Sequence, residues 1–268
     1  MRFFIFFGLL VPFVFISCKQ DDGFLLSEGN KLIRHFDKMD GFYFDHTYSY
    51  DHSGNMTMYK FDINGEKSII FEYFYDEENR VKKALRNDYP PDSNLGKIEY
   101  FYDQLGRLNE VVSFYSNDWG DSFNLANNSV KYYYDSDGNV ERLERIIRDF
   151  DSSQYYSPYA FFDIFYKWEN GNIVKEEYYN SEGIRALTMK YEYDTKPNFR
   201  KNLPPYITWP LYQTQNNIVR KIYIDHLGHY GRLVCTDCRY RYKYNRKGFP
   251  VEYFKTANSD RVFTMTYE

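Results

Sequence analysis

The stretch Tyr100-Phe101-Tyr102-Asp103-Gln104-Leu105-Gly106-Arg107-Leu108 decides the fold of this chain. Side chains that alternate with a period of two indicate a strand with one dry face and one wet face. An Asp after the strand accepts backbone N–H bonds at the head of a turn. A Gly three residues later takes the positive φ that a type I turn followed by a bulge requires. The stretch therefore predicts a β-hairpin.

The same phrase recurs along the chain. Clear copies span 48–55, 73–81, 100–108 and 132–140, and weaker copies span 166–173, 178–183, 191–194 and 242–249. Their irregular spacing leaves room for two strands and a variable outer loop in each unit, and neighbouring units must pair edge to edge to bury their aromatic faces. We predict an all-β fold, an antiparallel meander of β-hairpin repeats that forms one extended or curled sheet over residues 31–268.

The acidic residues of this phrase are interpreted as turn caps. They are Asp51, Asp76, Asp103, Asp135 and Asp194. Each follows an aromatic residue at a fixed place, which is typical of capping. A calcium loop would instead gather several oxygen ligands within about a dozen residues and close with a Glu.

Composition narrows the class of protein. With 30 Tyr and 24 Phe, 21% of the chain is aromatic, and such residues favour half-buried pleated surfaces. The formal net charge is -4 and no basic stripe occurs, which argues against nucleic acid as a partner. The chain lacks the G-x-S-x-G, H-E-x-x-H and Walker sequences. We therefore expect that the protein is not an enzyme and has no catalytic residues.

The N-terminus has the layout of an export signal. Arg2 precedes a mostly apolar run that ends at Ser17-Cys18, and this run is shorter than the roughly 20 residues of a spanning helix. Cys18 is therefore the predicted lipidation site, with an ordinary signal peptide and an incidental Cys as the alternative. We expect a signal peptide at 1–17, a lipidated tether at 18–30, and anchoring in the outer membrane at the cell surface, with the periplasmic face as the alternative.

The hairpin phrases resemble the Tyr-Asp repeat class, whose best-known members are the much longer Rhs and teneurin shells. Segments 191–199, 203–204 and 216–219 resemble a late insertion in a family of Bacteroidetes lipoproteins that carries a domain of unknown function. Segment 242–251 resembles the last hairpin of that family, and Lys19, Asp21 and Asp22 resemble its signal for the outer cell face. The resemblance implies a surface lipoprotein with a hairpin-repeat fold and implies no activity.

One cluster has metal-ligand chemistry. His226, His229, Cys235 and Cys238 form H-x-x-H-x5-C-x-x-C, and zinc accepts four such ligands. The alternative is a glycine-rich hairpin tip with solvated His side chains and either a local disulfide or two thiols. The second interpretation is preferred, so no cofactor is expected, and zinc is kept as the alternative.

Aromatic residues in polar or proline-rich loops form the other candidate site. Trp119, Tyr156 and Trp209 stand in such loops, where aromatics anchor glycans or protein partners or else cover the ends of a β-core. The favoured hypothesis is a non-enzymatic β-repeat binding or structural module held at the membrane by its lipid. The alternatives are a glycan-binding accessory lipoprotein and a zinc-binding module.

Overall fold

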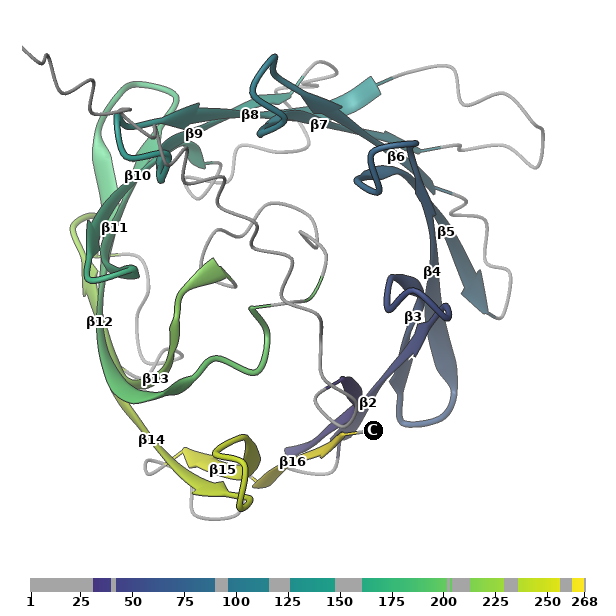
Figure 1. The fold of residues 1–268 in the computed structure, drawn as a ribbon. Coiled ribbons are helices and arrows are strands. Elements are labelled where there is room, and N and C mark those ends of the chain that lie inside the picture. The colour runs from purple at the N-terminus through teal and green to yellow at the C-terminus, as the bar shows by residue number, and fades with distance from the viewer. Residues whose placement is uncertain are drawn as a thin grey trace, which may run out of the picture.

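The strands close into a barrel. A computed structural model describes residues 31–39, 42–89, 96–115, 126–147, 161–201, 203, 213–228, 236–255 and 262–267. In this part of the chain, sixteen antiparallel strands pair in sequence order and β1 pairs with β16 (Figure 1). The strands are β1 Leu32–Met39, β2 Phe42–Tyr50, β3 Met56–Ile63, β4 Lys67–Tyr75, β5 Val81–Tyr89, β6 Gly96–Tyr102, β7 Leu108–Tyr115, β8 Ala126–Tyr134, β9 Val140–Ile147, β10 Phe161–Glu169, β11 Asn172–Asn180, β12 Arg185–Pro197, β13 Asn216–Asp225, β14 Asp237–Tyr244, β15 Pro250–Lys255 and β16 Val262–Tyr267. Within these ranges no helix is long and apolar enough to cross a membrane.

Closure corrects the fold expected from the sequence. The chain is all-β, but the prediction of an extended or curled sheet is wrong, because β1 and β16 pair from Leu32↔Tyr267 to Lys38↔Val262. An open sheet would present two rows of unpaired N–H and C=O groups at its edges, and closure removes both.

Most of the predicted turns have the expected geometry. In the turn between β6 and β7, Asp103 Oδ1 accepts the N–H groups of Leu105 and Arg107, both at 2.9 Å, and Gly106 has a φ of 77°. The register shifts at Tyr102, where the bulge was expected. Asn79 takes the same conformation with a φ of 64°, which Asn tolerates better than most residues. The turn prediction is confirmed for these hairpins.

Asp194 is an exception: its Oδ1 accepts the N–H of Lys196 at 2.9 Å, as expected of a cap, but it does not close a hairpin between two strands. It lies inside the 13-residue strand β12, which continues to Pro197. Its carboxylate accepts the N–H of Asn217 at 3.2 Å and a hydrogen bond from the hydroxyl of Tyr244. Asp194 therefore ties β12 to β13 and β14 instead of closing a hairpin.

A ring of side-chain hydrogen bonds, here named the rim ladder, joins successive hairpins at the end of the barrel that carries the aspartate turns. In each bond a Tyr hydroxyl or the Trp indole N–H at the end of one strand donates to a carbonyl oxygen at the start of the strand before it. The pairs are Tyr50–Leu32, Tyr75–Met56, Tyr102–Val81, Tyr134–Leu108, Trp168–Val140, Tyr193–Ile173, Tyr242–Ile218 and Tyr267–Pro250. The rim ladder explains why the aromatic residue of each of these pairs is Tyr or Trp and not Phe, which has no hydrogen-bond donor.

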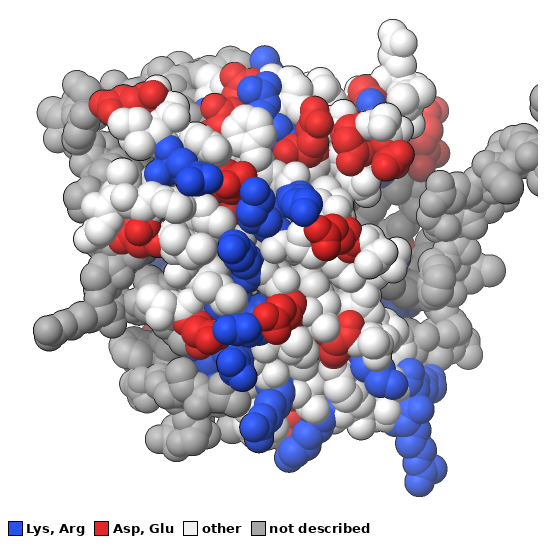
Figure 2. All heavy atoms as spheres, turned by 90° about the vertical axis from the view of Figure 1, so that its left-hand side faces the viewer, with Lys and Arg blue, Asp and Glu red and all other residues white. Residues whose placement is uncertain are grey.

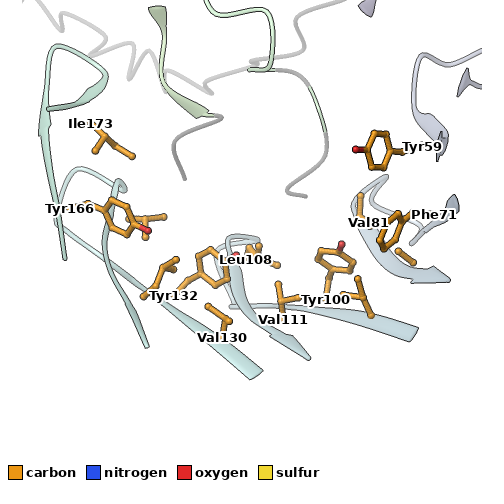
Figure 3. Close-up of a cluster of buried hydrophobic side chains, with 14 of the residues drawn as sticks. Tyr59, Phe71, Val81, Tyr100, Leu108, Val111, Val130, Tyr132, Tyr166 and Ile173 are labelled. Carbon is orange, nitrogen blue, oxygen red and sulfur yellow. The ribbon is translucent and has the colours of Figure 1, made fainter. Parts of the chain in front are cut away.

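The inner face of the barrel holds the core. Figure 3 shows the rings of Tyr59, Tyr100, Tyr132 and Tyr166 on the inner side of the wall, together with aliphatic residues such as Ile173. Each of these residues is at most 8% exposed. The alternation read from the sequence therefore places the apolar and aromatic face toward the barrel interior.

The outer face is charged. Lys60 on β3 lies 3.0 Å from Asp62, and Lys175 in the middle of β11 lies 2.9 Å from Glu177. Arg185 reaches the same Glu177 at 2.8 Å. On the side that carries β11 and β12, Figure 2 shows Lys, Arg, Asp and Glu side chains spread over the described surface. The wall therefore presents ion pairs to its surroundings, together with a few exposed apolar side chains such as Phe165.

Candidate functional site

The connection from β12 to β13 enters the barrel interior (Figure 1). We name residues 198–201 and 203 of this connection the inserted turn. Asn198 donates its backbone N–H to Gln215 O at 2.8 Å and its side-chain amide to Thr214 O at 3.1 Å. The N–H of Lys201 reaches back to Asn198 O at 3.2 Å. These bonds give the inserted turn a defined shape.

Aromatic contacts fix the inserted turn against the inner wall. The ring of Phe199 lies 6.0 Å from that of His35 on β1 and 6.5 Å from that of Tyr253 on β15. Leu203 packs against both clusters of buried apolar residues. The turn thus contacts β1 and β15, two strands that are far apart in the sequence.

Asparagines at the start of β13 hold the base of the inserted turn. Asn217 is 2% exposed, and its side chain donates to Pro197 O at 2.9 Å and accepts the N–H of Phe199 at 3.4 Å. Asn216 exchanges hydrogen bonds with Asn172 on β11 at 2.9 and 3.0 Å. Because these amides are committed to structure, they position the site and are poorly placed to bind a ligand.

A cavity of about 170 Å³ lies between the inserted turn and the inner wall, and we name it the lumenal pocket. Its lining combines aromatic rings, the structural amides and two cationic side chains. The residues are Asn198, Phe199, Arg200, Asn216, Asn217, Ile218, Lys221, Tyr240, Tyr242 and Tyr253. Ligand sites generally have this composition, a largely apolar surface with a few polar groups that fix orientation.

Lys221 is the unusual residue of this wall. It pairs with Tyr191 on β12 and with Cys238 on β14, so it faces inward, and its Nζ lies 4.8 Å from the centre of the Tyr223 ring. Burial lowers the pKa of Lys221, and the charge of Glu176 partly opposes that shift. No ion pair within 4.0 Å involves Lys221 among the residues that the structure describes. Its ammonium group is therefore stabilised by the charge of Glu176 and by the nearby rings of Tyr191 and Tyr223.

Glu176 supplies the negative charge near Lys221. It is fully buried on β11, and its Oε2 accepts the hydroxyls of Tyr178 at 2.5 Å and Tyr191 at 2.8 Å. A buried carboxylate needs such donors, because its desolvation is costly. The two tyrosines hold Glu176 on the wall beside the lumenal pocket.

Two histidines lie close to the inserted turn. The rings of His35 and His46 stack at 5.0 Å, and His46 Nδ1 is 2.7 Å from the hydroxyl of Tyr59. Burial, followed by the positive charge of Arg200, lowers the pKa of His35 to about 2 and that of His46 to about 4. The two rings are therefore neutral near pH 7, and Arg200 is a source of positive potential in the lumen.

The zinc candidates are only partly placed by the structure. His226 follows β13 in an exposed turn, with its Nε2 2.9 Å from Thr188 Oγ1, while Cys238 is buried on the inner face of β14. Thr188 belongs to the outer face of β12, so the two candidate ligands point to different sides of the wall. His229 and Cys235 lie outside the described residues, and no group of three metal-binding side chains occurs within them.

The remaining candidates also lie outside the described residues. They are Cys18, Trp119, Tyr156 and Trp209. Arg200, Glu176 and Lys221 are not among the residues predicted from the sequence. A signal for Lys221 was present, because it interrupts the inward-facing series of Ile218, Tyr223 and the neighbouring tyrosines with a charge.

Comparisons with known proteins agree with the barrel. No protein-family model and no curated protein matches the chain. The crystal structure of a porin-like protein from Bacteroides uniformis is similar over 89% of this chain and 97% of its own, with 12% identity and a TM-score of 0.54. One from Bacteroides vulgatus covers 89% and 98% with 10% identity and a TM-score of 0.39. The TcdB2-TccC3-Cdc42 structure covers 84% of this chain and 13% of its own, with 16% identity and a TM-score of 0.33.

The B. uniformis protein shares the fold, and at this identity the likeness extends to the fold alone. The class defined by the structure is a closed antiparallel barrel with a charged outer wall, an aromatic inner wall and a chain segment inside its lumen.

Proposed function

We propose that this chain is a non-enzymatic binding module: a Tyr-Asp repeat barrel that stands in water, is tethered to the outer membrane by lipid on Cys18, and binds a ligand in its lumen. The lumenal pocket beside the inserted turn supports the binding role. The apolar run before Cys18 supports the tether, and an attached lipid of more than one chain would anchor the protein firmly.

The charged outer wall is the single observation that carries this proposal. Barrels that span membranes turn apolar side chains outward, and a Lys or Arg at the bilayer midplane costs about 2–4 kcal/mol. Here Lys60, Lys175 and Lys190 lie near the middle of their strands on the outer face. Several such charges would make insertion of the wall into lipid strongly unfavourable, whereas water solvates them.

The test is the substitution Cys18→Ser in the full chain. We expect the wild-type protein to remain with membranes after carbonate extraction, and the variant to leave them and stay monodisperse without detergent. A substitution in the same segment that keeps the Cys, Lys19→Gln, is the control and should stay membrane-bound. If Cys18→Ser protein remains in carbonate-washed membranes, both the tether and the water-facing wall are refuted.

A further inference from the structure

The polar groups of the lumenal pocket divide into two kinds. The side-chain amide of Asn198 donates to Thr214 O before β13, that of Asn217 donates to Pro197 O at the end of β12, and the hydroxyl of Tyr242 donates to Ile218 O at 2.8 Å. Arg200 and Lys221 contribute positive charge to the same lining. The groups that can orient a bound molecule are therefore predominantly cationic.

The apolar surface of the lumenal pocket is aromatic and partly rigid. The rings of Tyr242 and Tyr253 lie 5.5 Å apart, and those of Tyr240 and Tyr253 lie 6.2 Å apart in an edge-on arrangement. Tyr253 is also stacked on Phe263 at 3.7 Å, which holds its plane. Planar faces fixed in this way favour a flat, apolar partner that can pack in an offset or edge-on position.

The volume of the lumenal pocket and its positive electrostatic potential restrict the ligand further. A cavity of about 150 Å³ accommodates benzene, so the 170 Å³ of the lumenal pocket suits a single ring with a small substituent. Burial is the first cause that lowers the pKa values of His35 and His46, and the positive charge of Arg200 is the second. The charge of Arg200 therefore acts on groups in the lumen. An anion in the lumenal pocket would reduce the electrostatic cost of holding Arg200 and Lys221 together.

We propose that the lumenal pocket binds a small aromatic carboxylate, with the carboxylate against Arg200 and Lys221 and the ring against Tyr240, Tyr242 and Tyr253. This inference rests on the proposed role as a lumenal binding module and names its ligand class. Arg presents a planar pair of donors that matches a carboxylate, and Lys adds a point charge.

Benzoate and its neutral counterpart benzamide are the probes. Titration calorimetry on the full-length Cys18→Ser protein should show saturable binding of benzoate that is about tenfold or more tighter than binding of benzamide, because a charge-assisted contact is lost with the amide. Equal affinity for the two probes, or no saturable binding of benzoate, would overturn the assignment without any lumenal variant having to fold.

Substitutions of Lys221 test whether benzoate binds in the lumenal pocket. Lys221→Met should weaken benzoate binding about tenfold or more and leave benzamide nearly unchanged, while Lys221→Arg should restore most of the affinity. Lys243→Met, on the outer face of β14, is the matched control and should bind like the parent. Unchanged affinity in a folded Lys221→Met protein would refute the site. If the Cys18→Ser barrel leaves the membrane and binds neutral aromatic probes as tightly as benzoate, the carboxylate inference fails while the lumenal binding module stands.

Discussion

The indole nitrogen of Trp168 donates a hydrogen bond to the carbonyl oxygen of Val140 at 2.8 Å, in the place where neighbouring hairpins use a tyrosine hydroxyl. Different ring chemistry thus makes the same bond at the same step of the rim ladder. The hairpins share a hydrogen-bond donor at the end of an aromatic ring. Its acceptor is a carbonyl oxygen next to the bulge of the preceding turn.

The first prediction concerns one step of the rim ladder. Tyr102→Phe removes the 2.8 Å bond to Val81 O and keeps the ring, so we expect the free energy of unfolding to fall by about 1 kcal/mol. Urea unfolding of the Cys18→Ser protein measures this change. Tyr179→Phe, on the outer face of β11, is the control and should differ little from the parent. Equal losses in the two variants would show that the rim ladder contributes nothing specific.

The second prediction concerns the turn between β6 and β7. Gly106 has a φ of 77°, a region that β-branched residues rarely adopt, so Gly106→Val should destabilise the barrel by about 1–2 kcal/mol. Gly106→Asn should cost much less, because Asn79 holds a φ of 64° in the preceding turn. The midpoints of urea unfolding of the two variants distinguish these outcomes. The backbone account is wrong if Val is tolerated as well as Asn.

The third prediction compares adjacent residues on opposite faces of β10. Tyr166 is 8% exposed and faces the lumen, whereas Phe165 is 41% exposed on the outer wall. Tyr166→Ala should reduce the free energy of unfolding by about 3–5 kcal/mol, and Phe165→Ala by less than about 1 kcal/mol. Chemical unfolding without detergent measures both. A larger loss at Phe165 would mean that the outer face is buried in the native protein.

The fourth prediction is a pH dependence set by His35 and His46. Burial, with Arg200 as the second cause, lowers the pKa of His46 from 6.5 to about 4 and that of His35 to about 2. Below pH 6.5 the unfolded chain therefore binds more protons at these sites than the folded barrel does. Stability should fall as the pH drops from 6.5 toward 4.5, by up to about 1.4 kcal/mol per pH unit for each His.

Urea unfolding at several pH values between 4.5 and 7.5 gives the slope. His46→Phe should reduce it, and His52→Gln, in the exposed turn after β2, should leave it unchanged. A slope that is the same in the parent and in His46→Phe would contradict the assignment.

The hairpins could be predicted from the sequence because their signals are local. The turn at Asp103 and Gly106 needs only residues within one phrase, and the structure reproduces its hydrogen bonds and its positive φ. Asp194 carries the same local signal and accepts the N–H of Lys196, but its carboxylate also binds Asn217 and Tyr244 from other strands, and β12 continues past it. Tertiary contacts override the local pattern at that position.

Closure and the lumenal pocket could not be predicted in the same way. Pairing of Leu32 with Tyr267 depends on the number and tilt of all strands between them, and no phrase encodes it. The pocket needs Arg200 from the inserted turn, Lys221 from β13 and tyrosines from β14 and β15, and no single phrase brings these residues together. Lys221 alone was visible as a charge on an otherwise aromatic face.

The partnership of β1 with β16 has a consequence for biogenesis. The first strand can complete its hydrogen bonds only after the last one, ending at Tyr267, has been delivered. Pairing across such a large sequence separation is intrinsically slow. A ribosome or translocon delivers the chain from its N-terminus, so one edge of β1 stays unpaired until β16 has emerged. We therefore expect this protein to depend on a chaperone until β16 is available.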